Sequence, residues 1–144
     1  MKPITLKFQA LGPFVEEQTV SFEDFRKDGL FLICGPTGAG KTTILDAMTM
    51  ALFNETGAGE KGLPGQRSKW APPALDTRVE FTFELGGHTY RFRRSMKKKP
   101  RSEGFNEEHL AYDESAADKV IADKDTRVTA EAERILGLTA DQFT

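Results

Sequence analysis

The chain has 144 residues, 38% of them hydrophobic, so it is long enough for one domain with a core and too short for two. Its formal net charge of −2 does not indicate a particular partner. No segment approaches the ~20 apolar residues of a membrane-spanning helix, and the N-terminus lacks the apolar stretch of a signal peptide. The single cysteine, Cys34, cannot form an internal disulfide, so we expect no membrane and a reducing, cytoplasmic setting.

The first thirty-four residues predict three strands. Ile4–Phe8 and Thr19–Phe22 alternate apolar and polar side chains, and Gly12 and Pro13 mark a turn between them, which is typical of a hairpin. Leu30–Cys34 is a short apolar run of the kind found in strands that are buried on both faces.

A glycine-rich loop follows this run and fits the pattern G-x-x-x-x-G-K-[ST] at every fixed position. Glycines let the backbone approach phosphates and point its N–H groups at them. Lys41 supplies charge to the β- and γ-phosphates of ATP, Thr42 is the expected Mg²⁺ ligand, and Thr43 adds a hydroxyl nearer the α-phosphate. The predicted ATP-binding residues are Gly35, Pro36, Thr37, Gly38, Ala39, Gly40, Lys41, Thr42 and Thr43.

A helix is expected to open at Lys41 and to direct the positive end of its dipole at the phosphates. Its predicted apolar stripe consists of Ile44, Leu45, Met48, Ala51 and Leu52. The alternative, a glycine-rich turn with a chance lysine, is disfavoured because a strand precedes the motif and a helix follows it.

Residues 57–73 are rich in glycine and proline and predict a loop that carries Trp70. Trp70 either stacks on a base or, as the favoured interpretation, packs the loop against the core. A second hairpin follows, in which Val79, Phe81 and Phe83 alternate with polar residues before a turn at Gly86-Gly87. Tyr90 and Phe92 alternate with Arg91 and Arg93 on the return strand.

The overall charge conceals a concentrated basic segment. Residues 1–90 carry a formal charge of −2, residues 91–101 carry +7 and residues 102–144 carry −7. Such a density suits the phosphates of a nucleic acid, and a solvated loop is the alternative. The predicted DNA-binding residues are Arg91, Arg93, Arg94, Lys97, Lys98, Lys99 and Arg101.

The acidic last part of the chain predicts a short strand at His109–Tyr112 and a helix over Val128–Leu136. Gly137 is expected to end that helix.

Four blocks of sequence, in this order, resemble the N-terminal segment of the SbcC family of bacterial ATPases, which work with a nuclease on DNA double-strand breaks. The blocks are Ala10–Phe14, Gly29–Met48, Asp76–Ser95 and Leu136–Thr144, and together they span essentially the whole chain.

The resemblance implies an α/β P-loop fold of the ABC-ATPase type, whose head is assembled from the two ends of a polypeptide with a coiled coil between them. Residues 1–144 then form the N-terminal half, with its phosphate loop at 35–43 and a small antiparallel sheet, and are incomplete without the C-terminal half. The implied partners are that half, a second head joined in an ATP-dependent dimer, an SbcD-like nuclease subunit and double-stranded DNA ends, in the cytoplasm and at the nucleoid.

In this family the Q-loop glutamine follows the point reached by Thr144, so Gln142 is not assigned that role, and the signature and Walker B motifs lie in the C-terminal segment. Leu110–Glu114 mimics a Walker B strand, but only three apolar residues precede its acids. Leu85-Gly86-Gly87 mimics part of a signature motif, and hairpin chemistry explains it better. No catalytic residue is therefore expected in this segment.

Three other functions stay open from the sequence. One is the head of a related repair ATPase of the RecF, RecN or SMC kind. Another is a small nucleotide kinase, which needs a lid arginine and a second acidic motif that the chain does not convincingly offer. The third is a basic nucleic-acid-binding module with a vestigial nucleotide site.

Overall fold

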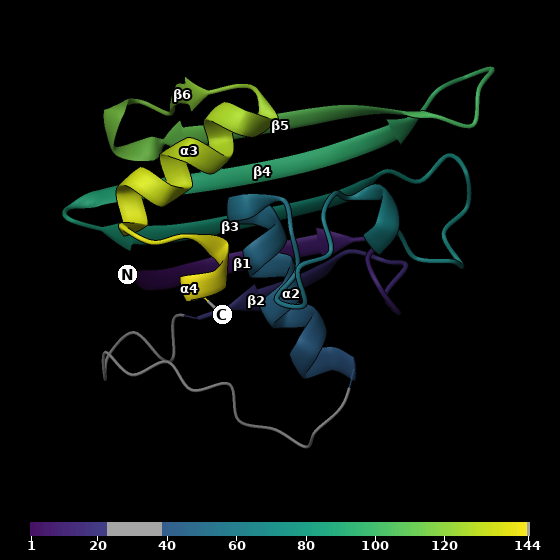
Figure 1. Ribbon diagram of the computed structural model, residues 1–144, viewed down its shortest axis with the longest axis horizontal. Helices are drawn as coiled ribbons and strands as arrows, with labels where there is room; N and C mark the ends of the chain where they lie inside the picture. Colours follow the sequence, from purple (N-terminus) through teal and green to yellow (C-terminus); the bar gives the residue numbers. More distant parts are fainter. Residues whose placement is uncertain (23–38, 144) are drawn as a thin grey trace.

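The structure, a computed structural model, describes residues 1–22 and 39–143, with the side chains of residues 39–42 excepted. In it, one antiparallel sheet carries helices on one face (Figure 1). The strands are β1 (Lys2–Gln9), β2 (Gln18–Ser21), β3 (Thr77–Leu85), β4 (His88–Lys98), β5 (Phe105–Asp113) and β6 (Lys119–Ala122). The helices are α2 (Ala39–Phe53), α3 (Asp125–Leu136) and α4 (Ala140–Phe143), with short 3₁₀ turns η1 (Pro64–Gln66) and η2 (Glu114–Ala116).

The described strands form one six-stranded sheet in the order β2-β1-β3-β4-β5-β6, and every neighbouring pair is antiparallel. The expected antiparallel sheet is thus confirmed, and it is larger than the sequence suggested. Both predicted hairpins are present, and Gly86 and Gly87 turn the second with φ values of 60° and 80°. A side chain would be strained at either glycine because positive φ brings Cβ close to the backbone.

The strands β3, β4 and β5 keep a two-residue alternation, which places one set of their side chains against the helices, and Leu6 and Phe8 of β1 join that set. The buried set packs into one hydrophobic core with the inner faces of α2, α3 and α4. Its strand members are Leu6, Phe8, Val79, Phe81, Phe83, Phe92, Met96 and Ala111.

Strand lengths in the second half of the sheet differ from the prediction. β4 runs on to Lys98, well into the basic segment, and β5 occupies Phe105–Asp113 where only His109–Tyr112 was expected. β6 was not predicted at all. Polar side chains at alternate positions on the solvent face obscured these strands, because a sheet with one wet face tolerates charge at every second residue.

The helix α2 packs on β3 and β4 through the second half of its length. Met48, Ala51 and Leu52 are buried as predicted, but Leu45 is 42% exposed, so the prediction that it belongs to the buried stripe is wrong. Ala47 and Met50 are fully buried instead, which shifts the stripe toward the C-terminal half of the helix.

The helix α3 begins at Asp125, three residues before its predicted start, and buries Val128 and Ala132 one turn apart. Gly137 ends it as predicted: at φ 70° its N–H donates to the carbonyl of Glu133. None of the helices among the described residues is long and apolar enough to cross a membrane. The predicted strand Leu30–Cys34 lies outside the described residues.

Candidate functional site

The backbone of α2 begins within the predicted phosphate loop, so Lys41 and Thr42 lie in the first turn of a fifteen-residue helix. No acidic residue occupies this turn, so the turn itself adds no negative charge at the positive end of the helix dipole. Gly35, Pro36, Thr37 and Gly38 lie outside the described residues, as do the side chains of residues 39–42, so their predicted contacts to ATP and Mg²⁺ stay predictions.

The turn after β1 lies against the first turn of α2. Thr43 is only 8% exposed, and a Cβ on Gly12 would come within 3.6 Å of its Oγ1, in ordinary contact distance. Gly12 has φ 56°, and its N–H donates to the carbonyl of Gln66 at 2.9 Å. A cavity of about 30 Å³ between these segments has room for water and none for a nucleobase.

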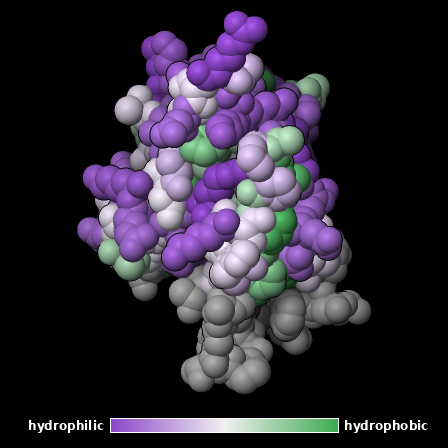
Figure 2. Space-filling model, turned by 90° about the vertical axis from the view of Figure 1, so that its right-hand side faces the viewer, coloured by the Kyte–Doolittle hydropathy of each residue, from purple (hydrophilic) through white to green (hydrophobic). Residues whose placement is uncertain are grey.

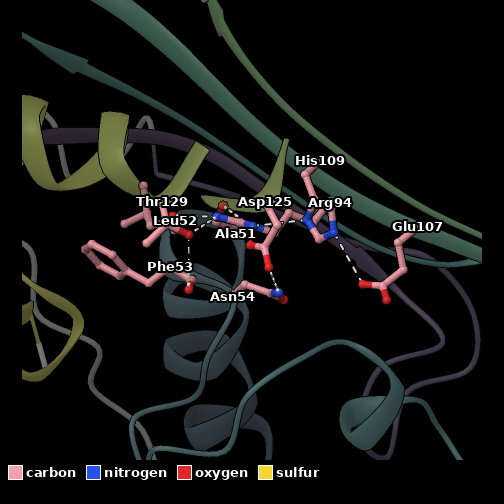
Figure 3. Close-up of polar contacts among 9 residues, drawn as sticks. All are labelled: Ala51, Leu52, Phe53, Asn54, Arg94, Glu107, His109, Asp125 and Thr129. Carbon is pink, nitrogen blue, oxygen red and sulfur yellow. Dashed lines mark hydrogen bonds and ion pairs between the residues drawn. The ribbon is translucent and has the colours of Figure 1, made fainter. Parts of the chain in front are cut away.

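The opposite end of α2 is capped by the side chain of Arg94 from β4 (Figure 3). The last carbonyls of a helix have no partner within the helix. Arg94 Nε donates to Ala51 O at 3.0 Å, and Arg94 Nη2 donates to Leu52 O at 2.8 Å. The guanidinium also bonds Asp125, Thr129 and His109, so all five of its N–H donors have acceptors.

Burial shapes the electrostatics of this cap. The side chain of Arg94 is fully buried, and burial lowers its pKa to about 10, although the Asp125 carboxylate partly offsets this. Arg94 therefore stays charged at neutral pH. Because a guanidinium only donates, His109 Nδ1 must accept from Arg94 at 3.0 Å, and His109 Nε2 carries the proton that faces Glu107. Burial and the neighbouring Arg94 lower the pKa of His109.

A wider groove, of about 370 Å³, lies beside this end of α2 and α3. Its lining includes the carboxylates of Glu55, Asp125 and Glu133 against the single ammonium of Lys61. This excess of negative charge makes the groove unsuited to a triphosphate.

The predicted DNA-binding residues do not form one surface. Arg94 faces the core with Phe92 and Met96, so the structure gives it a capping role and not an exposed one. Arg91 faces solvent on the other side of the sheet, but its guanidinium bonds Glu80, Glu114 and Asp118 and lies 4.0 Å from the ring centre of Tyr112. Burial lowers its pKa, but these carboxylates outweigh that effect, and the net shift is upward.

Of the predicted DNA-binding residues, four are exposed, at the end of β4 and in the turn to β5: Lys97, Lys98, Lys99 and Arg101. The turn is closed by Lys99 N–H donating to Gly104 O at 2.9 Å. Arg93 is half-buried on the solvent face of the same strand. We call the set Lys97, Lys98, Lys99 and Arg101 the basic tip.

Two other sequence features are clarified. Asp113, the first acid of the Walker B look-alike, accepts from Ser115 N–H at 3.0 Å and lies 2.9 Å from His88 Nδ1. Its carboxylate therefore holds the turn that follows β5 against the start of β4. Trp70 is 69% exposed, and the favoured interpretation that it packs the loop against the core is wrong.

With this geometry in view, the comparisons with known proteins define the class. A family model described as an AAA domain, AAA_23, matches residues 5–142, and the chain belongs to this family of P-loop domains. Over its whole length the chain is similar to the N-terminal part of proteins named as the SbcC component of the SbcCD nuclease.

The chain is 36% identical to the SbcC protein of Vibrio cholerae, with 99% of the chain and 15% of that protein covered. It is 37% identical to the Bacillus subtilis protein, with 100% and 13% covered, and 37% identical to the Lactococcus lactis protein, with 99% and 14% covered. The chain thus spans about a seventh of the length of these relatives. The resemblance seen in the sequence is confirmed, and the RecF, RecN or SMC kind and the nucleotide kinase are not favoured.

Proposed function

We propose that residues 1–144 are the ATP-binding N-terminal half of an SbcC-like, ABC-type ATPase head that acts in DNA-end processing during double-strand-break repair and recombination. The observation that carries this proposal is the phosphate-loop sequence running directly into α2, whose first turn holds Lys41 and Thr42 and no acid. The relatives, whose names identify them as components of the SbcCD nuclease, support it.

Each part of the motif would hold a different part of Mg²⁺–ATP. The backbone N–H groups of Gly35 and of residues 37–42, together with the start of α2, suit the phosphates. Lys41 suits the β- and γ-phosphates, and the Thr42 hydroxyl suits Mg²⁺. When bound, the metal neutralises charge that develops on the phosphates during hydrolysis. This chain's own contribution is to bind and orient the nucleotide.

Hydrolysis requires residues that this chain does not supply with a recognisable motif. Phosphoryl transfer depends on a positioned water and on further charge stabilisation, which a complete head and a second head would provide. We therefore propose as partners the C-terminal half beyond a coiled coil, a second head held by ATP, an SbcD-like nuclease subunit and double-stranded DNA ends on the chromosome in the cytoplasm.

A pair of lysine variants tests the nucleotide site. Lys41→Ala should strongly weaken binding of a fluorescent ATP analogue, because each charge-assisted contact to phosphate that is lost contributes about 1.5–3 kcal/mol. Lys61→Ala removes an exposed lysine beyond α2 and should bind normally. Equal affinity of a folded Lys41→Ala variant would overturn the assignment. Turnover should appear only when the C-terminal segment is added, and turnover by the 144-residue chain alone would show that its acids are catalytic.

The basic tip is proposed to contact the DNA backbone, because flexible lysines supply charge without the fixed geometry that base recognition needs. Arg93 is kept as a peripheral contact, while Arg91 and Arg94 are committed to the protein's own acceptors. Replacing Lys97, Lys98 and Lys99 by Gln in a complete head should weaken duplex binding and make the plot of log K against log salt shallower by about 0.9 per lost contact. The matched triple of exposed lysines Lys2, Lys7 and Lys119 should change neither.

A further inference from the structure

Trp70 has an exposed side chain on a backbone that is held in place. The backbone N–H of Trp70 donates to the hydroxyl oxygen of Ser68 at 3.3 Å, and the backbone N–H of Ala71 donates to the Ser68 carbonyl. Ser68 itself is only 4% exposed, and its N–H donates to the carbonyl of Ala10 at 2.9 Å. The backbone that carries the exposed indole is therefore held in place by hydrogen bonds.

Arg67 fastens the rest of the loop to the sheet. Its Nη1 donates to Leu75 O at 2.7 Å and to Thr77 Oγ1 at 2.9 Å, and its Nη2 donates to Pro72 O at 2.8 Å. Its guanidinium carbon also lies 5.5 Å from the centre of the Phe105 ring. The loop thus closes onto the start of β3 and the start of β5.

These contacts bring the Trp70 loop to the end of the sheet that carries the basic tip. Phe105 is paired with Lys98, and Lys97 Nζ lies 3.9 Å from Asp76, the residue before β3. In Figure 1 the loop after η1 and the turn between β4 and β5 lie at the same end of the molecule. Figure 2 looks onto this end, where hydrophilic residues dominate the surface.

We propose that Trp70 stacks on an unpaired base of a DNA single strand whose phosphates are held by the basic tip. An aromatic ring beside a cationic surface is the usual arrangement for single-stranded nucleic acid, since every base has a face that stacks. Bases inside a duplex already stack on each other, so Trp70 can select DNA with unpaired bases. This inference rests on the proposed DNA contact of the basic tip, and it adds a preference for single-stranded over double-stranded DNA.

A protein partner fits this surface less well. A contiguous exposed apolar patch of several hundred Å² is the usual mark of a protein-binding surface. The other exposed large hydrophobic residues among those described lie elsewhere: Met1 before β1, Leu45 on α2 and Val120 on β6. Among the described residues, Trp70 is therefore the exposed large hydrophobic residue of this loop; the exposed Lys69 precedes it in the sequence, and Ala71, Pro72 and Pro73 follow it.

The test uses the fact that Trp70 is the only tryptophan in the chain. Its fluorescence should be quenched when a thymidine oligonucleotide is added, and a blunt duplex should quench it far less. Trp70→Ala should weaken binding of the single strand about tenfold in an anisotropy assay and leave duplex binding unchanged. Trp70→Phe, which keeps a ring, should retain most of the affinity.

The outcomes separate this inference from the proposed function. Equal single-strand affinity of Trp70→Ala and the wild type overturns stacking, and if the lysine triple still weakens duplex binding, the backbone contact stands. If neither the Trp70 variant nor the lysine triple changes DNA binding, both proposals fall. Quenching by ATP alone, or only by the C-terminal half of the head, assigns Trp70 to the nucleotide or to a protein contact and overturns the inference.

Discussion

Replacing Arg94 by Met tests the idea that a strand side chain holds the end of the nucleotide-binding helix. The substitution leaves the carbonyls of Ala51 and Leu52 buried without donors, and each unsatisfied group costs about 1–3 kcal/mol. Asp125 is 47% exposed and can return to water, so its lost ion pair adds little. Removing a buried charge offsets part of the cost, and we expect a net loss of about 2–4 kcal/mol, a large part of the stability of a domain.

The measurement is urea unfolding followed by far-UV circular dichroism, because the exposed Trp70 is a poor reporter of the core. Arg93→Met, one residue away on the solvent face, is the matched control and should lose less than about 0.5 kcal/mol. Arg94→Lys keeps the charge but has three donors from one point, so it should lose at least half as much as Arg94→Met. Equal stability of the Met variants, or an Arg94→Lys variant as stable as the wild type, would refute the capping argument.

Three further changes probe other parts of the fold. Because folding lowers the pKa of His109, the neutral ring stabilises the fold fully above its ordinary pKa of 6.5, and the free energy of unfolding falls as the pH drops through 6.5. His109→Gln should flatten this pH dependence, measured as urea midpoints between about pH 7.5 and about pH 5. Gly137→Ala forces a side chain into φ 70° and should cost about 1 kcal/mol, and an unchanged melting temperature would contradict it. Arg91→Met leaves Glu80, Glu114 and Asp118 facing each other without a cation, so it should cost about 1 kcal/mol at low salt and less at high salt.

Sequence patterns were reliable where a single physical requirement decides the residue. Alternation at Val79, Phe81 and Phe83 located β3, and the need for positive φ at Gly137 located the end of α3. The phosphate-loop pattern correctly placed the start of a helix near residue 40. Its ligand contacts are matters of side-chain geometry that these patterns do not supply.

The charge count misled because it treats neighbours as equivalent. Arg93 and Arg94 are adjacent in the sequence and lie on opposite faces of β4. Arg94 lies two residues from both Phe92 and Met96 on β4, and this spacing was the signal that it points inward. Only the acceptors at the end of α2 explain why an arginine is stable there. Trp70 carried no such periodic signal, because loop residues follow no regular spacing.

The order of strands in the sheet has a consequence for how the chain folds. The strands β3 to β6 form a meander of neighbours in sequence, whereas β1 pairs with β3 across about seventy residues that include α2. Closing so long a loop costs conformational entropy before any contact forms, so the meander should assemble first and β1 should dock last. The nucleotide-binding helix packs mainly on β3 and β4, and a shorter segment joins it to β3, so it should dock onto the meander before β1 does. ATP added during refolding should then favour this docking of α2.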